Sequence, residues 1–320
     1  MTETPLFWLM AGKVADALFA LDRLGLLDAM REPTPLETLA ERAGISDRGL
    51  VALIPMLTKT GFLIRAENSV QLTDAGAGLL DMIRVERRLR DWREARDGVL
   101  RGLKGVIEDP LDEIKDDAFF AAYGRAMRAN ARPLALSLMR AASPAPGDAL
   151  LDIGGADGAV TAELLSRVTG TQATVVDRPA MRDLCAETVR RHGLSDRIAF
   201  VARDIRDSES VAEVSSGATM ILVCNVAHLL SDAALTRLLQ TLASSAPAAR
   251  LALYDMFPST EGPLGLSDLL ALDWTAGGTH FAASVEEMKH ILTSCGYGDV
   301  AVHPAPGLPG QILMARLEDA

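Results

Sequence analysis

A glycine-rich segment directly follows a short apolar run near the middle of the chain. The run at 150–153 leads into the sequence Gly-Gly-Ala-Asp-Gly at 154–158, and a helical pattern begins at about Ala159. Glycines in a strand-to-helix turn let the backbone pass close to a bound ligand. The G-x-G-x-x-G series that is typical of dinucleotide sites is absent. The segment therefore predicts a ligand site at the carboxyl end of a strand, with no clear pyrophosphate cradle.

Two acidic residues follow at the ends of the next two predicted strands. Asp177 lies 23 residues after Gly154, where a carboxylate can accept hydrogen bonds from both hydroxyls of a ribose. Asp204, between Arg203 and Ile205, suits the amino group and ring face of an adenine. Either acid alone is equally explained as a helix cap or a solvated strand end. Together with the glycine segment, at three consecutive strand ends, they favour a ligand that contains adenosine.

A histidine follows the fourth predicted strand, which covers 219–225. The residue is His228, and an imidazole can take a proton from a hydroxyl group. A single histidine after a strand also has a purely structural interpretation. We identify His228 as a candidate general base.

Together these segments resemble the small-molecule O-methyltransferases that carry a winged-helix dimerisation domain ahead of a class I methyltransferase domain. The resemblance covers nearly the whole chain, from the helix at 36–43 to the end. It implies S-adenosylmethionine as the cofactor. The residues it places around that cofactor are Asp152, Gly154, Gly155, Asp177, Arg178, Asp204, Ile205 and Asn225. Ala156 stands where family members frequently carry a third glycine.

The same resemblance implies three catalytic residues on the acceptor side of the site. His228 matches the general base, although the usual His-Asp-Trp sequence reads His-Leu-Leu here. Asp255 matches the first of two acids that orient or assist the histidine. At the place of the second acid, after Gly277 and Gly278, the chain has His280 instead.

Because His280 stands where the family has an acid, a different reaction is also consistent with the sequence. Some relatives of the family methylate a carbon of a 2-oxo acid and use a divalent metal to favour its enol. In that interpretation His228 and His280 are metal ligands, because imidazole suits iron, zinc and similar ions, and the metal acts as a Lewis acid. The plainer alternative is that His280 is a loop residue that lines a pocket.

Three further residues are candidates for contact with the acceptor substrate. The segment at 123–130 resembles the family's helix that closes over cofactor and acceptor, and Met127 matches a family residue there. Arg125 suits a carboxylate through paired hydrogen bonds. Trp274 offers an aromatic wall. Exposure of the arginine and burial of the tryptophan in a core are the structural alternatives.

The elements before these motifs have the pattern of a winged helix. Apolar spacing predicts helices over 6–25, over 35–43 with Thr34 as its start signal, and over 47–60, followed by short strands at 62–64 and 70–72. The third helix offers only Arg48 and Lys59 as basic residues, so DNA contact is disfavoured. A packing or dimerisation role fits its apolar face better.

The second half of the chain alternates strands with helices. Strands at 149–153, 173–177, 197–204, 219–225 and 251–256 predict a parallel, doubly wound sheet. Apolar runs near Val300 and at 312–315 are joined by a proline-containing loop and predict an antiparallel hairpin at the sheet edge. The expected fold is α/β, a Rossmann-like methyltransferase sheet with a terminal antiparallel hairpin, preceded by an all-α winged-helix dimerisation domain. The expected parts are 1–105, linker helices contributing to the acceptor pocket at 106–145, and the cofactor-binding domain at 146–320.

Composition restricts the compartment and the partners. Hydrophobic residues make up 49% of the 320 residues and charged residues 23%, an ordinary balance for a globular protein. The net charge of −11 disfavours nucleic acid as a partner. The three cysteines lack paired metal-ligand spacing and fit buried free thiols in a reducing compartment. The chain has neither a secretory start nor an apolar run long enough to span a bilayer. We therefore expect a cytoplasmic homodimer that acts on a small molecule, without a membrane partner.

Two other classes compete with this interpretation. One is a member of the fold that has lost methyl transfer and catalyses, for example, a cyclisation or hydroxylation. The other is a winged-helix transcriptional regulator with a nucleotide-sensing domain. Binding of S-adenosylmethionine or its demethylated product separates the enzyme from the regulator, for which salt-sensitive DNA binding is expected instead.

Overall fold

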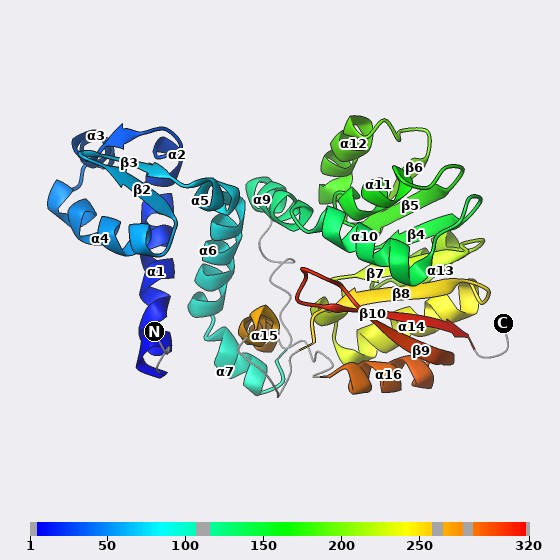
Figure 1. Cartoon of the computed structure of the whole chain (residues 1–320). Coiled ribbons are helices and arrows are strands. Elements are labelled where there is room, and N and C mark those ends of the chain that lie inside the picture. Colours follow the sequence, from blue (N-terminus) through cyan, green and yellow to red (C-terminus); the bar gives the residue numbers. More distant parts are fainter. Residues whose placement is uncertain (1–4, 107–115, 258–264, 278–283, 318–320) are drawn as a thin grey trace. The chain divides into compact units, whose positions relative to one another are not determined.

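The computed structural model describes residues 5–106, 116–257, 265–277 and 284–317 (Figure 1). The chain divides into two compact units, Met1–Asp91 and Trp92–Ala320. The boundary lies inside helix α6 (Leu80–Ala95). The sequence predicted three parts, with boundaries after residues 105 and 145, and this division stays a prediction.

The N-terminal unit combines helices with a small antiparallel sheet of order β1-β3-β2. Its long first helix, α1 (Pro5–Arg23), is the amphipathic helix predicted from the spacing of apolar residues. The remaining elements are α2 (Leu26–Ala29), β1 (Thr34–Pro35), α3 (Leu36–Ala43), α4 (Asp47–Lys59), β2 (Leu63–Ala66), β3 (Ser69–Leu72) and α5 (Asp74–Gly78). The order of helices and hairpin confirms the predicted winged helix, although the unit contains three short strands and is not purely helical.

The predicted role of Thr34 as the start signal of the second helix is wrong. Its hydroxyl donates to the carbonyl oxygens of Ala29, at 2.8 Å, and Glu32, at 2.9 Å. Its backbone pairs with Val70 in the sheet. Helix α3 begins after Pro35 without a side-chain cap. Carbonyls of the preceding turn give a threonine hydroxyl local partners that compete with helix capping.

The C-terminal unit is built on a seven-stranded sheet of order β6-β5-β4-β7-β8-β10-β9. The first five strands along the chain are parallel, and the last two form an antiparallel hairpin at one edge. The strands are β4 (Ala149–Ile153), β5 (Gln172–Asp177), β6 (Ile198–Ala202), β7 (Met220–Cys224), β8 (Arg250–Asp255), β9 (Tyr297–Pro304) and β10 (Gln311–Leu317). This confirms the predicted doubly wound sheet and its terminal hairpin.

Helices cover both faces of this sheet and enclose two apolar cores. Side chains of α10, α11 and α12 contribute to one core, and those of α14 and α16 to the other. The helices of the unit are α7 (Gly98–Leu103), α9 (Asp117–Arg128), α10 (Ala131–Ala142), α11 (Ala159–Leu165), α12 (Arg182–Arg191), α13 (Ser208–Ser215), α14 (Asp232–Ser245), α15 (Leu266–Gly277) and α16 (Val285–Ser294). Two short 3-10 turns, η1 (Pro179–Met181) and η2 (Ala227–Leu229), follow β5 and β7.

The order of the strands creates a crevice at the carboxyl ends of β4 and β7. Strand β4 pairs with β5 on one side and with β7 on the other. The chain runs from β4 through β5 to β6 on one side and then crosses back to β7 on the other side, so the strand order reverses next to β4. Ligands of open α/β sheets bind at such a switch point. The glycine segment after β4 and the histidine after β7 therefore lie at the same end of adjacent strands.

The cysteines are free thiols, with Cys185 and Cys295 buried and Cys224 half-buried. Burial raises the pKa of the Cys185 thiol to about 12. None of the helices described here has the length and apolar character needed to cross a membrane.

Candidate functional site

The glycine segment packs so tightly against its neighbours that side chains are excluded at two positions. Gly154 has a φ of +71°, and a Cβ atom there would lie 2.5 Å from Cγ2 of Val226. A Cβ atom on Gly155 would lie 2.5 Å from a carboxylate oxygen of Asp152. The turn ends at Gly158, which has a φ of +69° and precedes α11. Glycine is therefore required here both for backbone conformation and for close approach.

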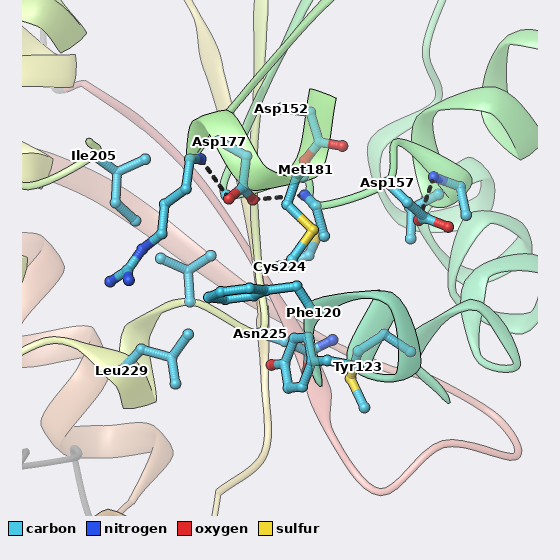
Figure 2. A pocket seen from close by; sticks show the side chains of 18 of the residues that line it. Phe120, Tyr123, Asp152, Asp157, Asp177, Met181, Ile205, Cys224, Asn225 and Leu229 are labelled. Atoms are coloured by element: carbon cyan, nitrogen blue, oxygen red, sulfur yellow. Dashed lines mark hydrogen bonds between the residues drawn. The ribbon is translucent and has the colours of Figure 1, made fainter. Parts of the chain in front are cut away.

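All eight residues predicted to surround the cofactor line one cavity above this segment (Figure 2). They come from the ends of four parallel strands and the turns after them. The cavity also has apolar walls supplied by α9 and by the turn after β7. The residues that complete much of its lining are Phe120, Tyr123, Met127, Asn130, Asp157, Met181, Cys224, Leu229 and Leu230.

Backbone hydrogen bonds, one of them from the glycine segment, hold the carboxylate of Asp177 in place. It accepts hydrogen bonds from the backbone N–H of Ala156, at 2.7 Å, and of Arg178, at 2.6 Å. Loss of solvent raises the pKa of Asp177, and these two donors oppose that effect. The carboxylate is thus held at the cavity wall, as Figure 2 shows, in a place suited to accept hydroxyl groups of a ligand.

A second carboxylate, that of Asp152, is buried under the same segment. Only 2% of the residue is exposed, and its carboxylate accepts the hydroxyl of Thr161 at 2.6 Å. Burial raises the pKa of Asp152 to about 6, and the nearby carboxylates of Asp177 and Asp157 add to the rise. The cavity floor thus brings together three acids, an arrangement that favours a ligand with positive charge.

The third strand-end acid, Asp204, forms a local ion pair. The guanidinium of Arg206 donates to both of its carboxylate oxygens, with Nη2 at 2.6 Å. This pairing lowers the pKa of Asp204. Asp204, Ile205 and Arg206 all line the cavity, so the predicted adenine contacts are at its wall.

Asn225 directly follows β7 and has a left-handed backbone conformation. Its φ is +56°. This value lies in the left-handed region that few residues other than glycine adopt. The N–H of Asn225 donates to the carbonyl of Tyr254 at 2.8 Å, which fixes the strained residue to β8. Strain of this kind is concentrated at functional sites, and here the turn redirects the chain into η2, which carries His228.

His228 and Asp255 form a buried pair at the ends of β7 and β8. The Nδ1 atom of His228 lies 2.7 Å from Oδ1 of Asp255, and the backbone N–H of His228 donates to Oδ2 at 3.3 Å. Asp255 is fully buried, and 7% of His228 is exposed. Because an ionised carboxylate accepts only, it holds the proton of the imidazole on Nδ1 and leaves the lone pair on Nε2. An imidazole in this tautomer can act as a base.

Trp274 lies against His228 and outside the lining of the cavity. The ring centroids of the two residues are 5.3 Å apart, with planes tilted by 33°. Helix α15, which carries Trp274, packs closely on α7, because a Cβ atom on Gly102 would lie 1.5 Å from the carbonyl oxygen of Thr275. The neighbouring Asp273 of α15 forms an ion pair with Arg93. The indole therefore covers the imidazole, and α7 and the side chain of Arg93 hold the helix that carries it.

The other predicted acceptor residues have different surroundings. Met127 lines the cavity, whereas Arg125 lies on the exposed side of α9 and outside the cavity lining. His280 lies outside the described residues. Within the described ranges no group of three or more histidines, cysteines and acids is arranged to hold a metal ion.

The sequence interpretation missed the aromatic wall and one ion pair. Phe120 and Tyr123 precede Met127 by seven and four residues, a helical spacing that puts all three on one side of α9. This spacing is visible in the sequence and could have predicted the aromatic wall. Arg128, on another side of α9, binds Asp157 of the glycine segment. A pairing across 29 residues leaves no local signal in the sequence.

Replacing Gly155 by alanine is expected to destabilise the C-terminal unit by roughly 1–3 kcal/mol, because the new methyl group overlaps the carboxylate of Asp152. Thermal unfolding measures the effect. A matched control is Gly49→Ala in α4, where a Cβ atom meets nothing within 4 Å and alanine is the better helix former. Equal melting temperatures for Gly155→Ala and the wild type would refute the tight packing of the segment.

Comparisons with known proteins agree on one class of enzyme. No family model matches the chain. It is 30% identical over 166 residues to the O-demethylpuromycin-O-methyltransferase of Streptomyces alboniger, a match that covers 50% of this chain but only 42% of that relative. It is 24% identical to the mitomycin biosynthesis 6-O-methyltransferase of Streptomyces lavendulae over 90% of this chain and 89% of the relative.

Solved structures share the fold over nearly the whole chain. Human N-acetylserotonin methyltransferase, solved in complex with S-adenosylmethionine, superposes with a TM-score of 0.74 at 19% identity and covers 99% of each chain. The two sequence relatives are named as O-methyltransferases and the structural neighbour as a methyltransferase, in agreement with the resemblance found in the sequence.

Proposed function

We infer that this chain belongs to the class I S-adenosylmethionine-dependent O-methyltransferases and transfers a methyl group from S-adenosylmethionine to a hydroxyl group of a small molecule. The observation that carries the proposal is one cavity that gathers the eight predicted cofactor residues, beside a buried histidine and aspartate pair. When bound, the cofactor supplies an electrophilic methyl group on a sulfonium.

The cavity has the chemistry that this cofactor requires. Asp177 has a fixed carboxylate that suits the two ribose hydroxyls, and Asp204 with Ile205 suits the adenine. Asp152 and Asp157 bring negative charge toward the end where the cationic amino-acid portion and the sulfonium belong. The absence of side chains at Gly154 and Gly155 leaves the backbone accessible to the ligand.

His228 is the proposed general base. Asp255 orients the imidazole through Nδ1, so that Nε2 is the atom that takes the proton of the acceptor hydroxyl. As this proton moves, positive charge develops on the imidazole, and the buried carboxylate of Asp255 stabilises it. Trp274 covers the imidazole, so that little of its surface reaches water.

The cavity wall points to an aromatic or otherwise apolar acceptor. Phe120, Tyr123 and Leu229 supply large apolar or aromatic surfaces opposite Asp152 and Asp177 (Figure 2), and Met127 also lines the cavity. Such walls bind flat rings by dispersion and ring contacts. We propose a phenolic secondary metabolite or a precursor of one. The two curated relatives named above belong, by their names, to puromycin and mitomycin chemistry.

The test is a methyl-transfer assay with labelled S-adenosylmethionine and two panels of acceptors, phenols and 2-oxo acids. Mass spectrometry of the product locates the label, and we expect an aryl methyl ether whose formation is unaffected by a chelator. Label on a carbon of a 2-oxo acid, together with loss of activity in chelator, would instead support the metal-assisted alternative with His228 and His280 as ligands.

The homodimer is a separate proposal that rests on the first helix. On α1, Phe7 is 52% exposed, Trp8 46% and Met10 45%. Large apolar side chains that are exposed together on one helix are typical of a protein interface. We expect light scattering at micromolar concentration to give twice the mass of 34.1 kDa. Trp8→Glu should shift the protein toward monomer, and a monomeric wild type would refute the proposal.

A further inference from the structure

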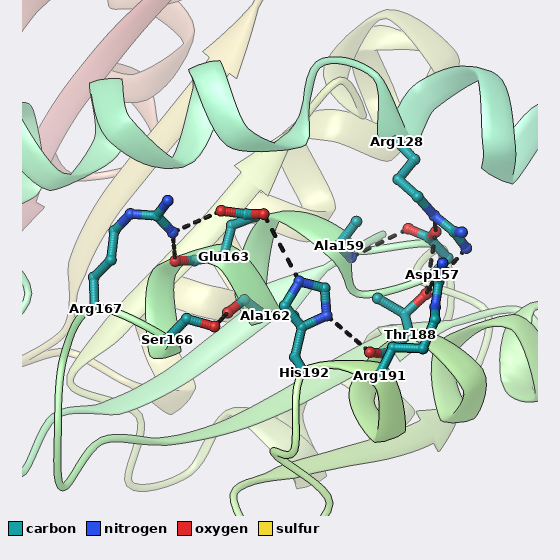
Figure 3. A network of polar contacts seen from close by, with 10 residues as sticks. All are labelled: Arg128, Asp157, Ala159, Ala162, Glu163, Ser166, Arg167, Thr188, Arg191 and His192. Carbon is teal, nitrogen blue, oxygen red and sulfur yellow. Dashed lines mark hydrogen bonds and ion pairs between the residues drawn. The ribbon is translucent and has the colours of Figure 1, made fainter.

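Asp157, in the glycine segment, is held from outside the cavity by Arg128 of α9 (Figure 3). The Nε atom of Arg128 donates to Oδ2 of Asp157 at 2.8 Å, and its Nη2 atom donates to the hydroxyl of Thr188 at 3.1 Å. The other carboxylate oxygen of Asp157 accepts the backbone N–H of Ala159 at 3.1 Å, at the start of α11. One arginine thus links three elements around a residue that lines the cavity.

One side of helix α9 faces the glycine segment and α12, and another side faces the cavity. Gly124 and Arg128, four residues apart, face the glycine segment and α12. A Cβ atom on Gly124 would lie 3.3 Å from Cδ1 of Leu184, so the helix approaches α12 closely there. Phe120, Tyr123 and Met127 face the cavity instead. The position of this aromatic wall is consequently linked to the Arg128 and Asp157 pair.

The charge of Arg128 acts on a group of acids. The side chain of Asp157 is 5% exposed and that of Arg128 is 25% exposed. Water therefore screens their interaction only in part. Asp152, Asp157 and Asp177 all line the cavity, and each negative charge affects the others. Removal of the guanidinium would leave Asp157 without its ion-pair partner and make the cavity more negative.

We propose that Arg128 is a positioning residue that, through Asp157, sets how strongly the cavity prefers the cationic donor S-adenosylmethionine over its neutral product S-adenosylhomocysteine. The inference rests on the proposed function. The two ligands differ in the sulfonium charge, which a negative cavity attracts. By compensating one of the three acids, Arg128 limits this attraction and allows the product to compete, whereas a purely structural role would affect both ligands alike.

The test is the ratio of the two dissociation constants, measured by calorimetry at pH 8 on the full chain. For Arg128→Met we expect the preference for S-adenosylmethionine over S-adenosylhomocysteine to rise roughly fivefold, because an uncompensated charge acts at intermediate effective dielectric. Arg128→Lys keeps the charge and should keep the wild-type ratio. The control Arg132→Met removes an exposed positive charge from α10 and should leave the ratio unchanged.

A second variant, in which the preference should change in the opposite direction, keeps the inference testable if Arg128→Met does not fold. Asp157→Asn keeps the arginine and removes one negative charge, so the preference for S-adenosylmethionine should fall below that of the wild type. Ratios that are unchanged in both variants, while the wild type binds both ligands, would overturn this inference and leave the proposed function intact. Failure of the wild type to bind either ligand would overturn the proposed function and the inference with it.

Discussion

His228→Ala is expected to lower the turnover number by roughly 10²–10⁴, which is the usual contribution of a positioned general base. The affinity for S-adenosylmethionine should change little, because His228 lies outside the cavity lining formed by the cofactor residues. Steady-state kinetics and calorimetry on the same preparation separate the two quantities.

A second substitution distinguishes loss of the base from disruption of the fold. Asp255→Asn removes the carboxylate that holds the proton on Nδ1 and should also reduce turnover, with cofactor affinity preserved. The exposed His290→Ala in α16 is the matched histidine control and should remain fully active. Near-normal turnover of His228→Ala would remove this residue from the mechanism.

Asp152→Asn is expected to stabilise the protein and at the same time impair cofactor binding. The folded protein holds a proton on this carboxyl up to about pH 6, because burial raises its pKa from the ordinary value of 3.8. Stability contributed by the protonated form is therefore present at low pH and lost as the pH rises through 6. At pH 8 the ionised carboxylate costs up to about 3 kcal/mol, which asparagine avoids.

Thermal unfolding and calorimetry test the two effects separately. The melting temperature of Asp152→Asn should exceed that of the wild type at pH 8, with the difference shrinking toward pH 4. Affinity for S-adenosylmethionine should fall by about ten- to a hundredfold, because a charged hydrogen-bond acceptor is lost. The exposed Asp196→Asn serves as the control and should change neither. A destabilised Asp152→Asn with unchanged cofactor affinity would contradict both expectations.

The sheet was predictable because its signals are local. The strand at 149–153 appears with the predicted bounds, and the terminal hairpin lies at the predicted edge. Short apolar runs bounded by glycine and proline specify such strands without knowledge of their partners. The three strand-end acids follow from the same logic, since parallel strands bring their carboxyl ends to one edge.

The parts that were not predictable depend on distant packing. Trp274 was expected to contact substrate, but the close approach of α7 to α15 at Gly102 places it against His228. Arg128 binds Asp157 because α9 lies beside the glycine segment, which helical periodicity does not reveal. The role of Trp274 toward a substrate stays a prediction.

The most direct test of the account is calorimetric titration of S-adenosylhomocysteine into the wild-type chain and into Asp177→Ala. We predict one binding site per wild-type chain and at least a roughly tenfold weaker affinity in the variant, because the carboxylate of Asp177 that we assign to the ribose hydroxyls is lost. A wild-type chain that binds neither S-adenosylhomocysteine nor S-adenosylmethionine, or a variant that binds as tightly as the wild type, would contradict the proposed cofactor site.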